Sequence, residues 1–243
     1  MRNSPSAETS SHRHRRLFLA RAVAVAATLT AMTGLSACSG NENAGDRPAP
    51  SSTPASRVCD GALDKLAAAS LKRLGNDDRF KELTGETDAG RPNTFSLSRA
   101  AAHLHDKTEL RSRCTLYLRG DTSGAPLIQL DFKAADSHPT RAAVEKAEPG
   151  RELTFYRLGA YAATSGDDST TLYFACPTKG TEGTTSYVDA SAFSSGNQLK
   201  GHSISKDRMT ILNSVARHLA EKLGCADEAR LPKTVPDGES VTP

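Results

Sequence analysis

Cysteine and histidine have the widest chemical choice of the residues in this chain, so their spacing decides which chemistry is open to it. Five cysteines occur, at Cys38, Cys59, Cys114, Cys176 and Cys225. The last four are separated by about 50 to 60 residues, which excludes the CxxC pairs of zinc ribbons and thioredoxin-like sites. Disulfides are therefore the first interpretation for these four, with free or metal-bound thiols as the alternative.

The segment His103-Leu104-His105-Asp106 is the densest group of candidate metal ligands. On a strand its two histidines would share one face, whereas on a helix they would point about 200° apart. A third ligand would have to be His138, His202 or His218, and no spacing supplies one. We therefore expect surface or capping histidines, and we predict no metal and no other cofactor.

Two further patterns resemble catalytic or calcium-binding motifs only weakly. Ala101-Ala102-His103 and Gly120-Asp121-Thr122-Ser123-Gly124 resemble the histidine and serine motifs of trypsin-like proteases, but they lie about 20 residues apart and Thr122 interrupts the second. Gly166-Asp167-Asp168 lacks the alternating spacing of an EF-hand loop, and it indicates a hairpin turn. No residue is assigned a catalytic role.

Three tyrosines, Tyr156, Tyr161 and Tyr173, lie near predicted strands. Their side chains could line a ligand surface, because a tyrosine offers both a ring and a hydroxyl group. The alternative is that they are half-buried residues of an ordinary sheet.

Residues 1–37 have the layout of an export signal: a basic start, an apolar stretch and then small residues. Arg15-Arg16-Leu17-Phe18-Leu19 resembles a twin-arginine signal, although Ala20 stands where lysine is common. The alternative is an ordinary basic region that precedes general secretion. The apolar stretch of residues 22–35 is shorter than the ~20 residues that span a bilayer.

The residues Leu35-Ser36-Ala37-Cys38 resemble the lipobox of bacterial lipoproteins. The resemblance implies cleavage before Cys38 and attachment of diacylglycerol to its sulfur, so that the lipid bilayer becomes a partner. It also implies a location on the outer face of the cytoplasmic membrane. Four cysteines then remain in an exported protein, an even number that favours two disulfides.

The net charge of +3 is distributed unevenly between the two sides of the predicted cleavage site before Cys38. Residues 1–37 contain five Arg and one Glu, which leaves 26 basic and 27 acidic residues in the mature part. The basic character therefore belongs to the export signal, and we expect no nucleic-acid partner.

Residues 38–57 are predicted to consist of Cys38, to which the lipid is attached, followed by a flexible linker. This segment is rich in Pro, Ser, Gly and Asn and has almost no large apolar residue to bury. A coil of this length would reach on the order of 25 Å, enough to hold a domain clear of a membrane.

Residues 58–225 are predicted to fold, with a helix at each end. Apolar residues at helical spacing predict a first helix over residues 60–74, with Asp60 as its cap and Gly75 at its end. A short second helix is expected at residues 78–83, and residues 96–105 suit either a helix or a strand. The last helix has an apolar stripe, a cap at Ser205 or Asp207, and Gly224 as its terminator. Residues 226–243 are expected to be a loose tail.

Alternating apolar and polar residues predict five strands between the helices. They cover residues 114–119, 128–133, 153–164, 170–176 and 186–190. The predicted fold is therefore α+β: a single domain with a central antiparallel sheet of about five strands, flanked by the two terminal helices.

Pairing the cysteines in sequence order would join each flanking helix to a strand of this sheet. Cys59 would bond to Cys114 and Cys176 to Cys225, although four cysteines allow three connectivities. Twin-arginine export carries folded proteins out of a reducing cytoplasm, so on that route the domain would have to fold before its disulfides form.

The signal, the lipobox and the spaced cysteines together resemble the secreted lipoproteins of actinobacteria, including small uncharacterised two-disulfide domains. The cysteine and element order is more distantly similar to the extracellular sensor domains of mycobacterial receptor kinases. The resemblance implies a fold class and no ligand site. We expect a binding or accessory module at the cell envelope, with a small molecule, a protein or a wall component as its partner. The alternative is an envelope hydrolase with dispersed catalytic residues.

Overall fold

The computed structural model describes residues 52–83, 94–107, 113–200 and 205–241, which all belong to one compact unit. The export signal with Arg15 and Arg16, the lipobox with Cys38, and His202 lie outside the described residues.

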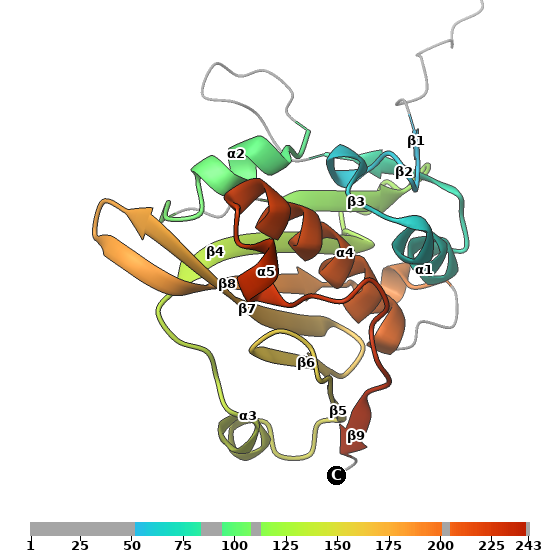
Figure 1. Cartoon of the computed structure of the whole chain (residues 1–243). Coiled ribbons are helices and arrows are strands. Elements are labelled where there is room, and N and C mark those ends of the chain that lie inside the picture. The colour runs from blue at the N-terminus through green and yellow to red at the C-terminus, as the bar shows by residue number, and fades with distance from the viewer. Residues whose placement is uncertain (1–51, 84–93, 108–112, 201–204, 242–243) are drawn as a thin grey trace, which may run out of the picture. The chain divides into compact units, whose positions relative to one another are not determined.

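The described residues form an antiparallel sheet of nine strands (Figure 1). Every neighbouring pair of strands runs antiparallel. Across the sheet the strands are β1 (Thr53–Pro54), β2 (Arg79–Glu82), β3 (Cys114–Leu118), β4 (Ile128–Ala135), β8 (Gly183–Phe193), β7 (Ser169–Gly180), β6 (Tyr161–Ser165), β5 (Leu153–Phe155) and β9 (Glu239–Val241).

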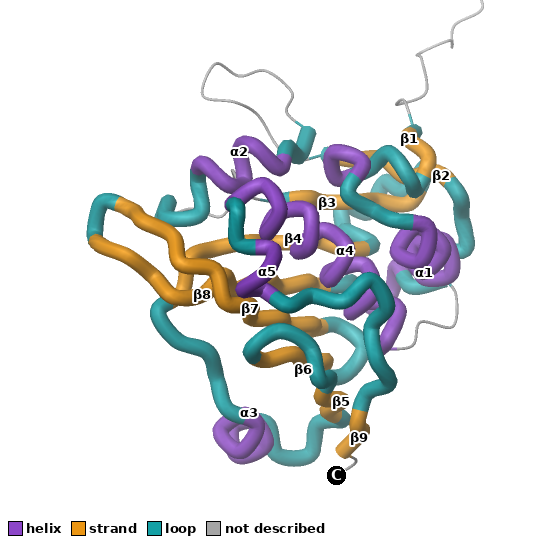
Figure 2. Tube along the Cα trace, in the orientation of Figure 1, coloured by secondary structure: helices purple, strands orange, loops and turns teal. Residues whose placement is uncertain are grey.

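One face of the sheet lies under a layer of helices built around α4 (Ser205–Leu223), which packs on β7 and β8 (Figure 2). Helices α1 (Lys65–Gly75) and α2 (Leu97–Ala102) pack against α4, and α5 (Ala226–Ala229) follows it and packs on β7. Two single 3₁₀ turns, η1 (Cys59–Gly61) and η3 (Gly196–Gln198), complete this part. No helix of the described residues is long and apolar enough to cross a membrane.

The predicted last helix is confirmed. Leu212, Val215 and Leu219 of its apolar stripe are fully buried, and Gly224 ends the helix with a φ of 79°. Asp207, predicted as a possible cap, instead accepts a hydrogen bond from Ser70 Oγ of α1 at 2.8 Å and pairs with Arg73. This carboxylate therefore joins two helices.

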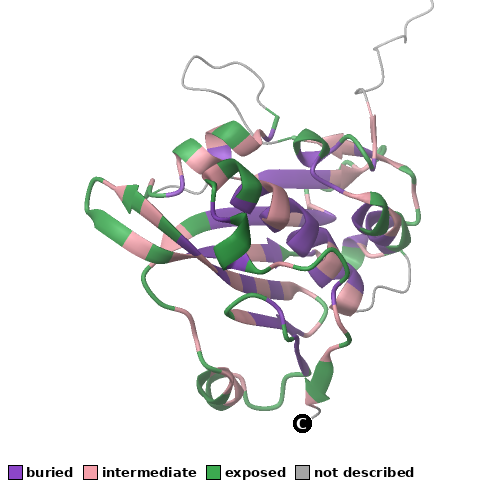
Figure 3. Ribbon diagram, viewed as in Figure 1, coloured by how far each residue is buried: buried purple, intermediate pink, exposed green. Residues whose placement is uncertain are grey.

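The two faces of the sheet differ because side chains alternate along each strand. In β7, Leu172, Phe174 and Cys176 are buried beneath the helices, whereas Thr171 and Tyr173 are half-buried on the opposite face (Figure 3). The short helix α3 (Arg141–Ala147) contributes Val144 to a small second cluster with Leu153, Phe155 and Ala163 on that opposite face.

The predicted first helix begins later than expected. Asp64, not Asp60, caps α1 and accepts hydrogen bonds from the amides of Leu66 and Ala67 at 3.0 Å. Asp60 has a φ of 61° inside η1, so a turn separates it from the helix. At the other end Gly75 is the last helical residue, and Asn76 follows it in the left-handed conformation.

The prediction of about five strands is wrong in number, since the sheet has nine. Residues 153–164 form two strands, because the chain turns back at Gly159, where a Cβ would clash with the carbonyl of Tyr173. The expected helix at residues 78–83 is instead β2, whose single fully buried side chain, Phe80, left no strand alternation to recognise. Strands β1 and β9 supply the other two.

Both predicted flexible ends contribute to the sheet. Thr53 and Pro54 of the expected linker pair with Phe80 and Arg79, so the folded part begins before residue 58. The expected loose tail contains α5 and β9, and its Val235 is buried. Edge pairing satisfies the backbone groups of these polar segments, which composition alone cannot indicate.

The two disulfides join Cys59 to Cys114 and Cys176 to Cys225, which confirms the predicted sequence-order pairing. The first joins η1 to β3, and the second joins β7 to the residue that follows α4 and Gly224. The second bond therefore joins the last helix to the sheet as predicted, whereas the first joins the turn before α1, not the helix itself, to the sheet.

Replacing Cys176 and Cys225 together by Ala should lower the free energy of unfolding by about 4 kcal/mol, because the closed loop of 49 residues no longer restricts the unfolded chain. Urea unfolding followed by circular dichroism measures the change. The paired Cys59→Ala and Cys114→Ala variant should lose a similar amount, since its loop spans 55 residues. An unchanged midpoint in both variants would contradict the prediction.

Gly238→Ala should destabilise the protein by roughly 1–3 kcal/mol, because the added Cβ would overlap Thr154 and Tyr156 where the tail approaches β5. Thermal unfolding measures this, and Gly196→Ala is the matched control, since nothing lies within 4 Å of its Cβ position. Equal melting temperatures for both variants would mean that the tail is not held against β5.

Candidate functional site

The sheet face opposite α4 is the candidate site, and its central part is here called the polar face. Direct cross-strand pairing places its residues in three rows of strands β4, β8 and β7. The β4 row is Gln129, Asp131, Lys133; the β8 row is Phe193, Ser191, Asp189, Tyr187; and the β7 row is Thr171, Tyr173, Ala175.

Asp131 lies at the centre of the first charge group on this face. Its carboxylate accepts from Arg113 Nε at 2.5 Å and from Gln129 Nε2 at 2.8 Å. Only 8% of Asp131 is exposed, so its charge is held in place largely out of water. The neighbouring guanidinium and amide remain half-buried donors.

Asp189 lies at the centre of the second group, which runs straight across four strands. Register places Lys133, Asp189, Tyr173 and Tyr161 side by side. Tyr173 Oη donates to Asp189 Oδ2 at 2.9 Å, and Lys133 Nζ lies 3.5 Å from the same oxygen. Asp189 is 7% exposed, so this carboxylate is also largely desolvated.

A chain of rings continues from these residues across the sheet. His138, in the loop after β4, meets Tyr187 edge to face at 5.0 Å between ring centroids and lies 6.4 Å from Tyr173. Tyr173 meets Tyr161 at 6.2 Å, and Tyr161 meets Phe155 at 6.3 Å. Such edge-to-face contacts hold the rings in fixed orientations.

The environment raises the pKa of both central tyrosines. Burial raises the pKa of Tyr161 to about 12, with a smaller contribution from the charge of Glu148. Burial and then the Asp189 carboxylate raise the pKa of Tyr173 above its ordinary range. Both phenols are therefore neutral near neutral pH, and they act as hydroxyl donors and acceptors rather than as bases.

The arrangement combines fixed acceptors, fixed donors and ring edges on one surface, which is what binding a polar ligand requires. In the described residues, no group of three His, Cys, Asp or Glu side chains is placed to hold a metal ion.

The structure separates the three tyrosines that the sequence singled out. Tyr161 and Tyr173 lie together on the polar-face side of the sheet, as a ligand surface requires. Tyr156 instead donates to Ser205 Oγ at the start of α4, at 2.9 Å, and belongs to the main core.

The candidate metal ligands are dispersed. His103 Nδ1 pairs with Asp106 at 2.8 Å, whereas His105 Nε2 contacts Thr178 Oγ1 at 3.0 Å on the β7–β8 hairpin. His218 pairs with Glu221 on α4, and His138 lies among the tyrosines.

The two motif-like loops are turns. Ser123 Oγ donates a hydrogen bond to Asp121 at 2.9 Å within the β3–β4 connection, which precedes the first residue of β4. Leu104, the neighbour of His103, accepts a backbone hydrogen bond from Ala134 at the opposite end of β4. The histidine and serine segments are thus not brought together. Gly166-Asp167-Asp168 forms the predicted hairpin turn between β6 and β7.

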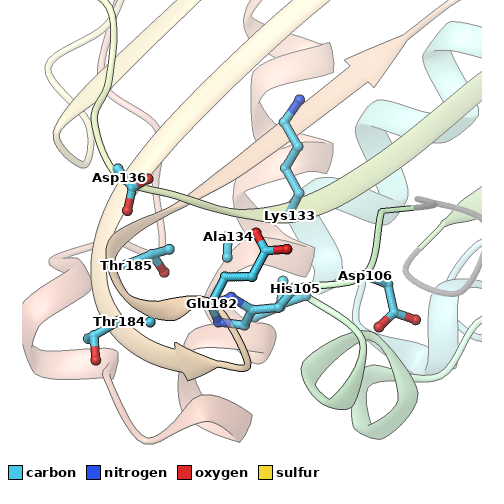
Figure 4. A pocket seen from close by; sticks show the side chains of 10 residues that line it. His105, Asp106, Lys133, Ala134, Asp136, Glu182, Thr184 and Thr185 are labelled. Carbon is cyan, nitrogen blue, oxygen red and sulfur yellow. The ribbon is translucent and has the colours of Figure 1, made fainter. Parts of the chain in front are cut away.

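A separate hollow of about 340 Å³ lies where the tip of the β7–β8 hairpin faces the His105 segment (Figure 4). Three acidic residues, Asp106, Asp136 and Glu182, contribute to its lining. Lys133 also lines this hollow, and Figure 4 shows its side chain pointing away from His105 and Glu182.

Sequence reasoning did not identify Asp131 and Asp189 as site residues. A signal for Asp131 was present, because a carboxylate at an outward position of an apolar strand stood between Gln129 and Lys133. Asp189 gave no such signal, since only the register of β8 between β4 and β7 places it beside Lys133 and Tyr173.

Asp189→Asn should lower the pKa of Tyr173, because it removes the negative charge and the carboxylate acceptor that favour the neutral phenol; burial keeps the pKa above its ordinary value. Ultraviolet titration of the tyrosines measures the shift. The raised pKa means that the fold loses stability as pH rises beyond about 10, the value in an unfolded chain.

Tyr173→Phe is the control, since it should remove the high-pH ionisation of Tyr173 from the titration altogether. If Asp189→Asn left that transition in place, the hydrogen bond between the two side chains would not govern the ionisation.

Comparison with known proteins found no match to the chain among protein-family models, curated proteins or solved structures.

Proposed function

We propose that this protein is a lipid-anchored binding module at the outer face of the cytoplasmic membrane, and that the polar face is its binding surface. The observation that carries the binding role is the set of largely desolvated carboxylates, Asp131 and Asp189, held among half-exposed donors and rings. A surface whose polar groups are fixed before binding loses little side-chain freedom when a partner arrives.

The proposed location rests on residues 1–38. The lipobox Leu35-Ser36-Ala37-Cys38 supports lipid attachment, and Arg15 and Arg16 support export by the twin-arginine route. The two disulfides are consistent with this, since disulfides persist in oxidising compartments. Several acyl chains on one cysteine would hold the protein firmly, whereas a single chain binds a membrane only marginally.

A second candidate function is an envelope hydrolase, and one observation favours it. Asp131 and Asp189 lie diagonally on neighbouring strands of the same face, since Asp131 pairs with Ser191. Paired carboxylates of this kind can serve as the acid and base of hydrolysis. The variants Asp131→Asn and Asp189→Asn distinguish the two functions. If the protein is a hydrolase, the wild type should cleave an envelope polymer and both variants should lose that activity. If it is a binding module, the wild type itself should show no cleavage.

Cys38→Ala should release the protein from membranes into the medium or stall its processing, because the sulfur that carries the lipid is gone. Fractionation with immunodetection measures the location, and mass spectrometry of the wild type should find lipid on an N-terminal Cys38. A mature N-terminus elsewhere, without lipid, would contradict the anchor.

The binding role is tested with the mature domain and isolated cell envelopes. The wild type should sediment with the envelopes, and Ser191→Arg, in the centre of the polar face, should reduce the bound fraction. Leu66→Arg is the matched control, because Leu66 is 50% exposed on α1 in the helical layer. Equal loss in both variants, or in neither, would mean that the polar face is not the binding surface.

A further inference from the structure

We propose that the polar face binds an uncharged glycan chain that lies along β8. The inference rests on the proposed binding function and names the substrate class for the same site. Its grounds are the length of the surface, its balanced charge, the way its hydrogen-bonding groups are paired, and the position of its rings.

The surface has the shape of a strip with a ring at each end. Phe193 and Tyr187 mark the two ends of the β8 row, with Ser191 and Asp189 between them. Phe193 lies six positions beyond Tyr187 along the strand, a distance of about 20 Å. An extended oligomer would therefore meet a ring at either end and polar groups along its middle.

Phe193 is the ring of the polar face that is most open to a ligand. It is one of three large apolar residues of the described chain that are strongly exposed, and it is 46% accessible. Its strand neighbours on the same face are Gln129 and Ser169, so the ring stands beside polar groups rather than in an apolar patch. A ring beside hydrogen-bonding groups suits a ligand that is itself part apolar and part polar.

Among the described residues, the charged side chains of the polar face balance. Two carboxylates, Asp131 and Asp189, are matched by Arg113 and Lys133, each at its own carboxylate. A polyanion such as a nucleic acid or a phosphate-rich polymer would need an excess of cations, and a polycation would need an excess of acids. The balance therefore favours an uncharged partner over a highly charged one.

The hydrogen-bonding groups come as acceptors with donors beside them. Asp131 has the guanidinium of Arg113 and the amide of Gln129 next to it, and Asp189 has the Tyr173 hydroxyl. A sugar hydroxyl donates one hydrogen bond and accepts others, so it can use such a pair fully. Ser191 and Thr171 lie opposite each other on β8 and β7. Their hydroxyl groups extend this pattern through the centre of the face.

The rings provide the second half of a sugar-binding surface. The C–H faces of a pyranose are apolar, and they pack on aromatic rings such as those of Phe193 and Tyr187. The contact of Tyr187 with His138, and of His138 with Tyr173, fixes the rings near one end of the strip. A protein partner is less suited, because a protein interface has an apolar core, and Phe193 is the only strongly exposed large apolar residue among those that define the polar face.

The test is a titration of the mature domain with chitopentaose, an uncharged oligomer of N-acetylglucosamine. The chain has no Trp and five Tyr, so its intrinsic fluorescence comes from tyrosine, and Tyr173 and Tyr187 lie on the polar face. Saturable change of this fluorescence, with a matching heat signal by calorimetry, is the expected result.

Phe193→Ala should weaken binding about five- to tenfold, the loss that one aromatic contact implies. Phe193 is exposed, so its removal should leave the melting temperature nearly unchanged. Leu66→Ala, an equally exposed apolar residue in the helical layer, should bind like the wild type. Equal affinities for the Phe193→Ala and wild-type proteins would overturn the assignment.

Three other outcomes would also overturn it: tighter, salt-sensitive binding of the polyanion heparin, self-association that Phe193→Ala abolishes, or no binding of chitopentaose together with none of the uncharged glucose oligomer cellopentaose. If the oligomers fail while envelope binding still depends on Ser191, the glycan class is wrong and the binding function stands. If envelope binding also fails to depend on Ser191, both proposals are wrong.

Discussion

The burial of β7 and β8 beneath α4 is the interaction on which the rest of the structure depends. Leu172 and Phe174 of β7 and Val188 of β8 have no exposed surface, and neither do Leu212 and Val215 of α4. Because strand side chains alternate, burying one set of residues commits the intervening set to the opposite face. The polar face is thus a direct consequence of where the helix packs.

Much of this arrangement was readable from the sequence, for physical reasons that are local. The stripe of α4 and the alternation of β3, β4 and β7 are periodic signals, and the turn at Gly166 has its own residue chemistry. The strands at and beside the edges of the sheet were missed because they lack such signals. Strand β2 fully buries only Phe80, and β9 is three residues long, so tertiary pairing overrides their weak local preferences.

The candidate site was predicted only in part, because its parts meet through register. The pairing of Tyr161 with Tyr173 could be suspected from their strands, but a shift of one residue would have moved either ring to the core face. The same dependence explains Asp189, whose partners Lys133 and Tyr173 come from two other strands. Local patterns indicate which residues face outward, and only the assembled sheet determines which of them are neighbours.

The second disulfide has a consequence for the order in which folding and oxidation can occur. It joins β7 to the residue just beyond α4, two elements that already share a fully buried apolar contact. The bond therefore locks a contact that hydrophobic burial can form without it. A domain built in this way can acquire its shape under reducing conditions and be oxidised afterwards, which is what the twin-arginine route that we propose would require.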